Sequence, residues 1–146
     1  MYFDPGVVDA NILVYAFNAD VPQHAASRAL IEASRLPSGT LYVTSQILCE
    51  FYSIITNVRR FPQAVSPFDA VRILSALLAL PGLVVLPAPA SVVANWMQLL
   101  QRQPVTGGDI FDLQIVATML ANGIARIYTF NADDFKVFPG LTVVTP

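Results

Sequence analysis

Residues 6–11 read GVVDAN, and this stretch decides the fold class. The run from Gly6 to Val8 is apolar, rich in β-branched residues and too short for a helix, which predicts a buried strand that ends at Asp9. From Asn11 to Phe17 the pattern becomes helical. A short apolar strand that leads directly into a helix is typical of a parallel sheet covered by helices.

The same alternation of strand and helix continues along the chain. Further helices are expected at residues 23–35, 45–59 (capped by Thr44 or Ser45), 67–80 (capped by Ser66), 90–101 and 109–122, where Gly123 closes the last one. Further strands are expected at residues 41–43, 83–86, 127–129 and 141–144. The sequence predicts an α/β fold, a three-layer sandwich with a central, mainly parallel β-sheet flanked by helices.

The composition limits the architecture and the partners. The chain has 146 residues, 55% of them hydrophobic and 12% charged, which predicts one domain spanning residues 1–146 and excludes disorder. So few charges predict apolar surface that faces a partner, in a dimer or a complex. The net charge of −2 gives no general attraction to phosphate backbones, so any contact with nucleic acid must be local.

Cysteine usage and the N-terminus bear on localisation. Cys49 is the single cysteine, and the opening MYFDPG lacks the basic and apolar regions of a signal peptide. Both observations predict a protein of the reducing cytoplasm. The longest uncharged stretch, residues 73–101, is interrupted by Pro81, Gly82, Pro87 and Pro89, which favours buried structure over a membrane helix and predicts no membrane partner.

Six of the ten acidic residues lack an ordinary surface explanation. Asp9 follows the first strand, where capping and functional interpretations are about equally plausible. Glu50 has apolar or small neighbours in ILCEFYSII, which favours a buried or crevice-facing carboxylate. Asp112 begins an apolar helix, and a capping role is preferred for Asp109. The segment YTFNADDF, which contains Asp133 and Asp134, follows the fourth strand.

Carboxylates gathered at one end of a parallel sheet repel one another and are stabilised by a divalent cation. An all-oxygen set selects Mg²⁺, or alternatively Mn²⁺. His24 is the only histidine and Cys49 the only thiol, so neither a zinc site nor a Cys-His or Ser-His nucleophilic site is expected. Gly107-Gly108 has no phosphate-loop context. The chemistry that fits is metal-assisted hydrolysis of a phosphodiester.

Four segments in order, VVDANILVYA, TSQILCEFYSIITN, IFDLQIVATMLANG and IYTFNADDF, resemble the PIN-domain family, and most closely its VapC-type ribonuclease toxins. The resemblance implies catalytic carboxylates at Asp9, Glu50, Asp112 and Asp134, of which Asp9 and Asp112 bind the metal. It also implies supporting polar groups at Asn11, Thr129 and Asn131. Asn131 stands where the family often has another aspartate, and one extra residue precedes Asp134.

The resemblance also implies partners. Toxins of this family cleave RNA, usually dimerise, and are silenced by a cognate antitoxin that covers an apolar groove and inserts a basic side chain among the carboxylates. We expect that groove at the helices predicted for residues 23–35 and 44–59. Candidates for contacts to RNA phosphates are Arg59, Arg60, Arg72 and Arg102.

Two alternatives remain at this stage. Asp9-Ala10-Asn11 is similar to the nucleophile loop of haloacid-dehalogenase-like phosphatases, which also need a late lysine, and Lys136 is the only lysine. A catalytically degenerate PIN-fold module for RNA binding or interaction is the other. The retained Asp9, Glu50 and Asp112 favour an enzyme, and alanine at each is expected to remove activity while the fold survives or gains stability.

Overall fold

The computed structural model describes residues 2–146 and contains one five-stranded sheet. All neighbouring strands are parallel, in the order β3-β2-β1-β4-β5. The strands are β1 (Gly6–Val8), β2 (Leu41–Val43), β3 (Leu83–Val85), β4 (Arg126–Tyr128) and β5 (Thr142–Val144). The predicted α/β class is confirmed, and the sheet is entirely rather than mainly parallel.

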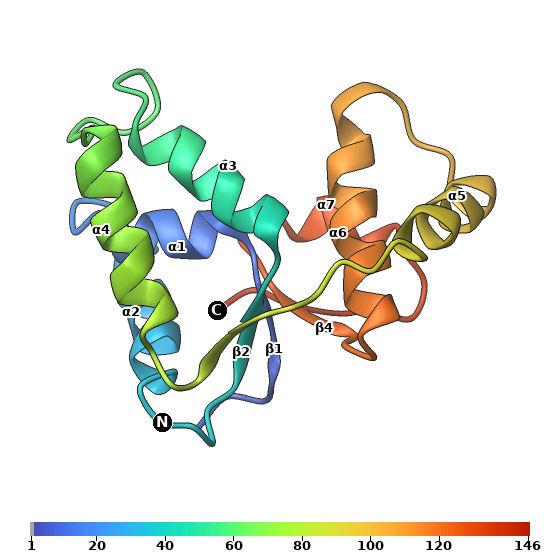
Figure 1. Ribbon diagram of the computed structural model, residues 1–146, viewed down its shortest axis with the longest axis horizontal. Coiled ribbons are helices and arrows are strands. Elements are labelled where there is room, and N and C mark those ends of the chain that lie inside the picture. The colour runs from blue at the N-terminus through green and yellow to red at the C-terminus, as the bar shows by residue number, and fades with distance from the viewer. Residues whose placement is uncertain (1) are drawn as a thin grey trace.

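Helices cover both faces of this sheet. The first face carries α1 (Ala10–Ala16), α2 (His24–Ala33), α3 (Ser45–Ile55) and α4 (Pro67–Leu78), and the second carries α5 (Val92–Arg102), α6 (Ile110–Ala121) and α7 (Ala132–Lys136). Figure 1 shows these two groups on opposite sides of the strands. The arrangement follows from right-handed crossovers, because the chain moves outward from β1 to β3 and then returns to β4 and β5 on the other side. This is the predicted three-layer sandwich.

The centre of the sheet marks the place for a ligand. β1 and β4 are neighbours, with Val7 paired to Ile127 and Val8 to Tyr128. The connection after β1 runs toward β2, whereas the connection after β4 runs toward β5. Such a reversal opens a crevice beyond the carboxyl ends of the two strands, which is where open α/β sheets bind ligands.

Local capping confirms several predicted helix boundaries. The Ile47 amide donates to Thr44 Oγ1 at 3.1 Å, and the Asp69 amide donates to Ser66 Oγ at 3.1 Å. Each side chain accepts a bond from an amide that has no partner inside its helix. Gly123 ends α6 with a φ of +71°, a conformation that glycine adopts without a steric penalty.

Three local predictions are corrected. The helix expected to reach Arg59 ends at Ile55, and Asn57 then forms an Asx turn by accepting from the Arg59 amide. Asp109 is not a capping residue, since its backbone is already helical and its side chain accepts no capping bond. The segment after β4, expected as a loop and turn, forms the short helix α7.

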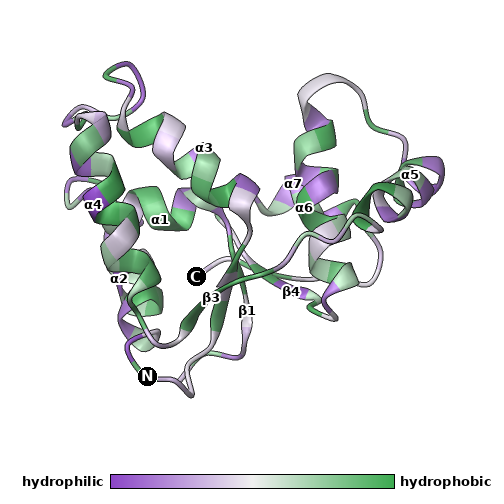
Figure 2. Cartoon of the chain, viewed as in Figure 1, coloured by the Kyte–Doolittle hydropathy of each residue, from purple (hydrophilic) through white to green (hydrophobic). Residues whose placement is uncertain are grey.

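The core lies between the sheet and its helices. Val7, Val8 and Ile127 from the central strands are fully buried. α6 is buried at consecutive positions from Ile115 to Met119, so it is apolar on nearly every side. Figure 2 accordingly shows α1, α6 and β3 mainly in the hydrophobic colour. Within residues 2–146, no helix has the length and hydrophobicity needed to cross a bilayer.

Candidate active site

Asp9 lies where β1 passes into α1, at the crevice described above. It is 6% exposed and occupies the N-cap position of α1. Its Oδ1 accepts from the Ala10 amide at 2.7 Å, and its Oδ2 accepts from Thr129 Oγ1 at 2.7 Å and from Asn11 Nδ2 at 3.2 Å. Burial raises the pKa of Asp9, while the bonds from Thr129, Ala10 and Asn11 oppose that rise. Asp9 therefore caps α1 and also lies at the crevice, so the two interpretations of this residue are compatible.

Asn11 and Thr129 connect the two strand ends around Asp9. Asn11 Nδ2 also donates to Thr129 Oγ1 at 3.3 Å, and the Phe130 amide donates to Asn11 Oδ1 at 3.3 Å. The Asn131 amide donates to Thr129 Oγ1 at 3.0 Å. Thr129 is fully buried. These bonds hold the Asp9 carboxylate in one orientation, a supporting role that polar neighbours of metal ligands commonly have.

Glu50 projects from the middle of α3 and is partly buried. Burial raises its pKa, and the negative charge of Asp9 adds to the rise. Gln46, one helical turn earlier, opposes it by donating from Nε2 to Glu50 Oε1 at 3.4 Å, and the positive charge of Arg60 opposes it further. Glu50 therefore lies within electrostatic reach of Asp9.

Asp112 lies in the first turn of α6 and is also partly buried. Burial and the negative charges of Asp9, Asp134, Glu50 and Asp109 raise its pKa to about 7. A shift of this size marks a carboxylate whose charge is poorly compensated by the protein alone. Four carboxylates from four separate parts of the chain thus act on Asp112.

Asp134 lies on α7 and is exposed. It lines a cavity of about 320 Å³ together with Asp109, Asp112 and Asp133. The side chain of Asn131 is exposed and makes no capping bond, so only its backbone takes part in the network around Thr129. Asp134 is therefore the carboxylate that reaches the cavity from α7, the helix that follows β4.

The donor chemistry suits a hard divalent cation. The converging groups are carboxylate oxygens whose mutual repulsion a cation would relieve. Within residues 2–146, however, no three side chains of the His, Cys, Asp or Glu types lie close enough to hold one ion. Coulomb repulsion acts over longer distances than coordination, so both observations hold together. The carboxylates face one space, but no three of those described are close enough together to bind one ion.

Sequence reasoning did not single out Gln46. Its Nε2 donates to the carbonyl oxygen of Phe111 at 2.8 Å as well as to Glu50. The signal was present, because residues four apart share one face of a helix and Gln46 precedes Glu50 by four. The contact with Phe111 could not be found in this way, since it joins residues 65 positions apart.

Comparison with known sequences places these residues in a family context. The model of the PIN domain family matches residues 6–141. The chain is 36% identical over 118 residues to the VapC ribonuclease Mb2897 of Mycobacterium bovis and to ribonuclease VapC43 of Mycobacterium tuberculosis. In both cases the match covers 79% of this chain and 78% of the relative.

Solved structures show the same fold. VapC20 of Mycobacterium tuberculosis, described as a toxin that cleaves the sarcin-ricin loop, matches with a TM-score of 0.70 and 22% identity, over 98% of this chain and 100% of that one. VapBC-1 of nontypeable Haemophilus influenzae matches with a TM-score of 0.65 and 16% identity, over 97% of each chain. VapBC2 of Rickettsia felis, solved with a promoter DNA fragment, matches with a TM-score of 0.64 and 19% identity, over 97% and 98%.

Proposed function

Because the chain belongs to the PIN-domain family, with VapC ribonucleases among its relatives, we propose that it is a metal-dependent endoribonuclease and the toxin of a toxin–antitoxin pair. One observation carries this proposal. The negative charges of Asp9, Glu50 and Asp134 converge on Asp112 at the carboxyl ends of β1 and β4. A haloacid-dehalogenase-like phosphatase loses its support, since the family match covers the segments that suggested it.

Asp9 and Asp112 would hold the ion, with Glu50 and Asp134 completing the acidic set. Bound Mg²⁺ or Mn²⁺ would supply activation of a water molecule and neutralise charge on the leaving oxygen. Asn11 and Thr129 keep the Asp9 carboxylate oriented through their hydrogen bonds. The reaction needs no covalent nucleophile from the protein, in keeping with the absence of a Ser-His or Cys-His arrangement from the sequence.

Removal of the metal tests this function. Purified protein is expected to cleave structured RNA in Mg²⁺ or Mn²⁺, and EDTA is expected to stop cleavage until excess metal is restored. Gel analysis of the RNA products measures both. Cleavage that persists in EDTA contradicts the metal requirement, whereas RNA binding without cleavage under any metal supports the degenerate module. Turnover of p-nitrophenyl phosphate without cleavage of RNA would indicate a phosphatase.

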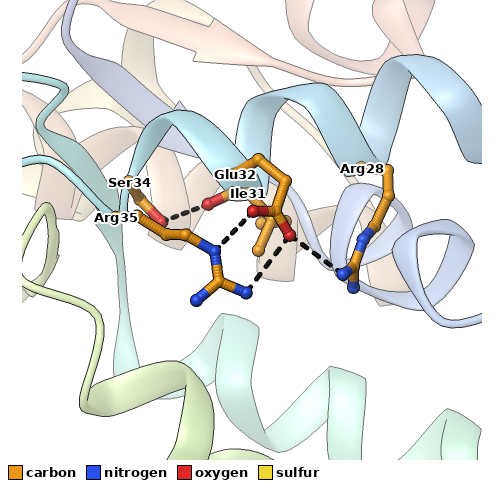
Figure 3. A network of polar contacts seen from close by, with 5 residues as sticks. All are labelled: Arg28, Ile31, Glu32, Ser34 and Arg35. Carbon is orange, nitrogen blue, oxygen red and sulfur yellow. Dashed lines mark hydrogen bonds and ion pairs between the residues drawn. The ribbon is translucent and has the colours of Figure 1, made fainter.

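The arginines differ in whether a nearby carboxylate already neutralises their charge. Arg28 and Arg35 flank Glu32 on α2, as Figure 3 shows, with Arg28 Nη2 at 2.9 Å from the Glu32 carboxylate. Arg126 lies 3.4 Å from Asp4. Across the described part of the chain, no ion pair is found for Arg59, Arg60, Arg72 or Arg102. Of these, Arg60 is the one whose charge reaches a site carboxylate, Glu50.

We therefore expect Arg60 to contact an RNA phosphate next to the scissile bond. Arg60→Gln should raise KM for RNA by roughly 3- to 10-fold and reduce the slope of log affinity against log salt by about one. Arg28→Gln removes the same charge from α2, where Glu32 already neutralises it, and is the matched control. An unchanged salt slope for Arg60→Gln would show that its guanidinium does not neutralise a phosphate.

The partner proposed for the apolar surface is an antitoxin, with a homodimer as the assembly. The antitoxin groove is proposed at the helices near residues 23–35 and 44–59, which correspond to α2 and α3 and each pack on α1. An apolar hollow of about 240 Å³ lies between α3, the second of these helices, and α4. Phe68 and Val71 of α4 are 72% and 56% exposed. The hollow is lined by Ser45, Leu48, Cys49, Tyr52 and Leu74.

A further inference from the structure

α3 and α6 carry Glu50 and Asp112, yet the two helices have different packing partners. α3 packs against α1 and α4, whereas α6 packs against α5 and the 3-10 turn η1 (Gly107–Asp109). Figure 1 shows α3 and α6 standing apart on the two sides of the sheet. Both helices contribute buried side chains to the common core, and polar interactions that cross directly between them add to what the core fixes.

Gln46 supplies the hydrogen bond that crosses. Its Nε2 donates to the carbonyl oxygen of Phe111 at 2.8 Å, and the same nitrogen donates to Glu50 Oε1 at 3.4 Å. Phe111 directly precedes Asp112 in the first turn of α6. Among residues 2–146, this is the only hydrogen bond that joins a side chain of α3 to α6. The side-chain amide of Gln46 thus contacts both α3, through Glu50, and α6, through Phe111.

We propose that Gln46 is a positioning residue of the ribonuclease site, which sets the separation of Glu50 and Asp112 by holding α3 to the start of α6. This inference rests on the proposed ribonuclease function. Reactive groups need to be held within about 0.5 Å of their productive geometry by neighbours that are themselves fixed. Since no three acidic side chains among residues 2–146 lie close enough to hold one ion, the contact that ties α3 to α6 bears directly on the separation of Glu50 and Asp112.

The oxygen atom of the Gln46 side chain helps to distinguish a positioning role from a purely structural one. Gln46 Oε1 is buried and has no hydrogen-bond partner among residues 2–146. A buried acceptor without a donor lowers the stability of a protein. A glutamine kept for stability alone would be a poor choice here, because an apolar side chain of similar length would avoid that cost. The hydrogen bonds of Gln46 to Phe111 and Glu50 are therefore expected to position the site residues rather than to stabilise the fold.

Gln46→Met tests the proposal, because methionine keeps the length of the side chain and removes both polar atoms. We expect kcat for RNA cleavage to fall about 10-fold or more, KM to stay within about twofold, and the melting temperature to be unchanged or higher. Gln101→Met on the exposed face of α5 is the matched control and should leave all three unchanged. Backbone amides in the first two turns of α6 should exchange hydrogen faster in Gln46→Met than in the wild type.

Two results would overturn the proposal. The first is a kcat for Gln46→Met within twofold of the wild type, and the second is a loss of kcat that matches a loss of folded protein. If the wild-type chain cleaves no RNA, the proposed function fails, and the contact from Gln46 to α6 is judged by hydrogen exchange alone. Unchanged exchange at the start of α6 in Gln46→Met then shows that Gln46 does not hold the two helices together.

Discussion

Asp112→Asn is expected to abolish RNA cleavage, by about 10³-fold or more, while making the metal-free protein more stable at pH 8. Activity falls because the variant loses a carboxylate that would bind the metal. Stability rises because the neutral amide avoids the cost of a partly buried charge and no longer repels Asp9, Glu50 and Asp134; burial first and these charges second raise the pKa of Asp112 to about 7. Opposite signs in activity and stability distinguish a functional carboxylate from a structural one.

The stability gain depends on pH in a defined direction. In the unfolded chain an aspartate titrates near 3.9, so the folded protein binds this proton more tightly. Ionised Asp112 therefore lowers stability progressively as pH rises from about 4 to about 7, and the full cost remains above that. After allowing for its partial exposure, the cost is on the order of 1–2 kcal/mol, or roughly 3–8 °C in melting temperature. Asparagine carries no such cost.

Thermal unfolding in EDTA at pH 8 and at pH 4.5 measures this effect, with RNA cleavage in Mg²⁺ as the activity assay. The gain should appear at pH 8 and largely vanish at pH 4.5. Growth offers an independent measurement: expression of the wild-type chain should arrest bacteria, and Asp112→Asn should not. A variant that is less stable than the wild type at both pH values would mean that Asp112 supports the fold.

Asp9→Ala is expected to remove activity to the same extent but to destabilise the protein. Asp9 is buried and accepts bonds from the Ala10 amide, Thr129 and Asn11. Alanine leaves those donors without an acceptor and removes the N-cap of α1, at a cost of about 1–2 kcal/mol. The relief of burying a carboxylate offsets part of this cost. The sequence-based expectation of an unchanged or more stable fold therefore does not extend to Asp9.

Asp9→Asn is the matched variant, because its side-chain oxygen can still accept from Ala10 or Thr129. It should regain most of the stability and none of the activity. Urea unfolding at pH 7 and RNA cleavage measure the two quantities. If Asp9→Ala unfolds at the wild-type urea concentration, the hydrogen bonds around Asp9 do not stabilise the fold, and the capping interpretation is wrong.

Much of the site could be predicted because it follows from the direction of the strands. Asp9 and Thr129 each follow a short apolar run, and the ends of parallel strands meet at one edge of a sheet. The strand direction therefore predicts the common edge, whereas the hydrogen bond between Asp9 and Thr129 also requires β1 and β4 to be neighbours. Glu50 was singled out by its apolar neighbours, and the structure places it within electrostatic reach of Asp9.

The remaining features depend on tertiary contacts that a linear pattern does not contain. The bond from Gln46 to Phe111 joins two helices on opposite sides of the sheet. Asp109 was expected to cap α6, but η1 continues directly into that helix, so the backbone at Asp109 is already helical. Helical periodicity likewise gave no stop at Ile55, after which Asn57 forms an Asx turn.

The strand order also has a consequence for folding of the chain during its synthesis. β4 inserts beside β1, and Thr129, which follows it, lies 120 residues after Asp9. A nascent chain leaving the ribosome therefore exposes Asp9 and Glu50 well before β4 and Thr129 emerge. The hydrogen bonds from Thr129 to Asp9 and from Asn11 to Thr129 therefore form only after the residues of β4 have left the ribosome.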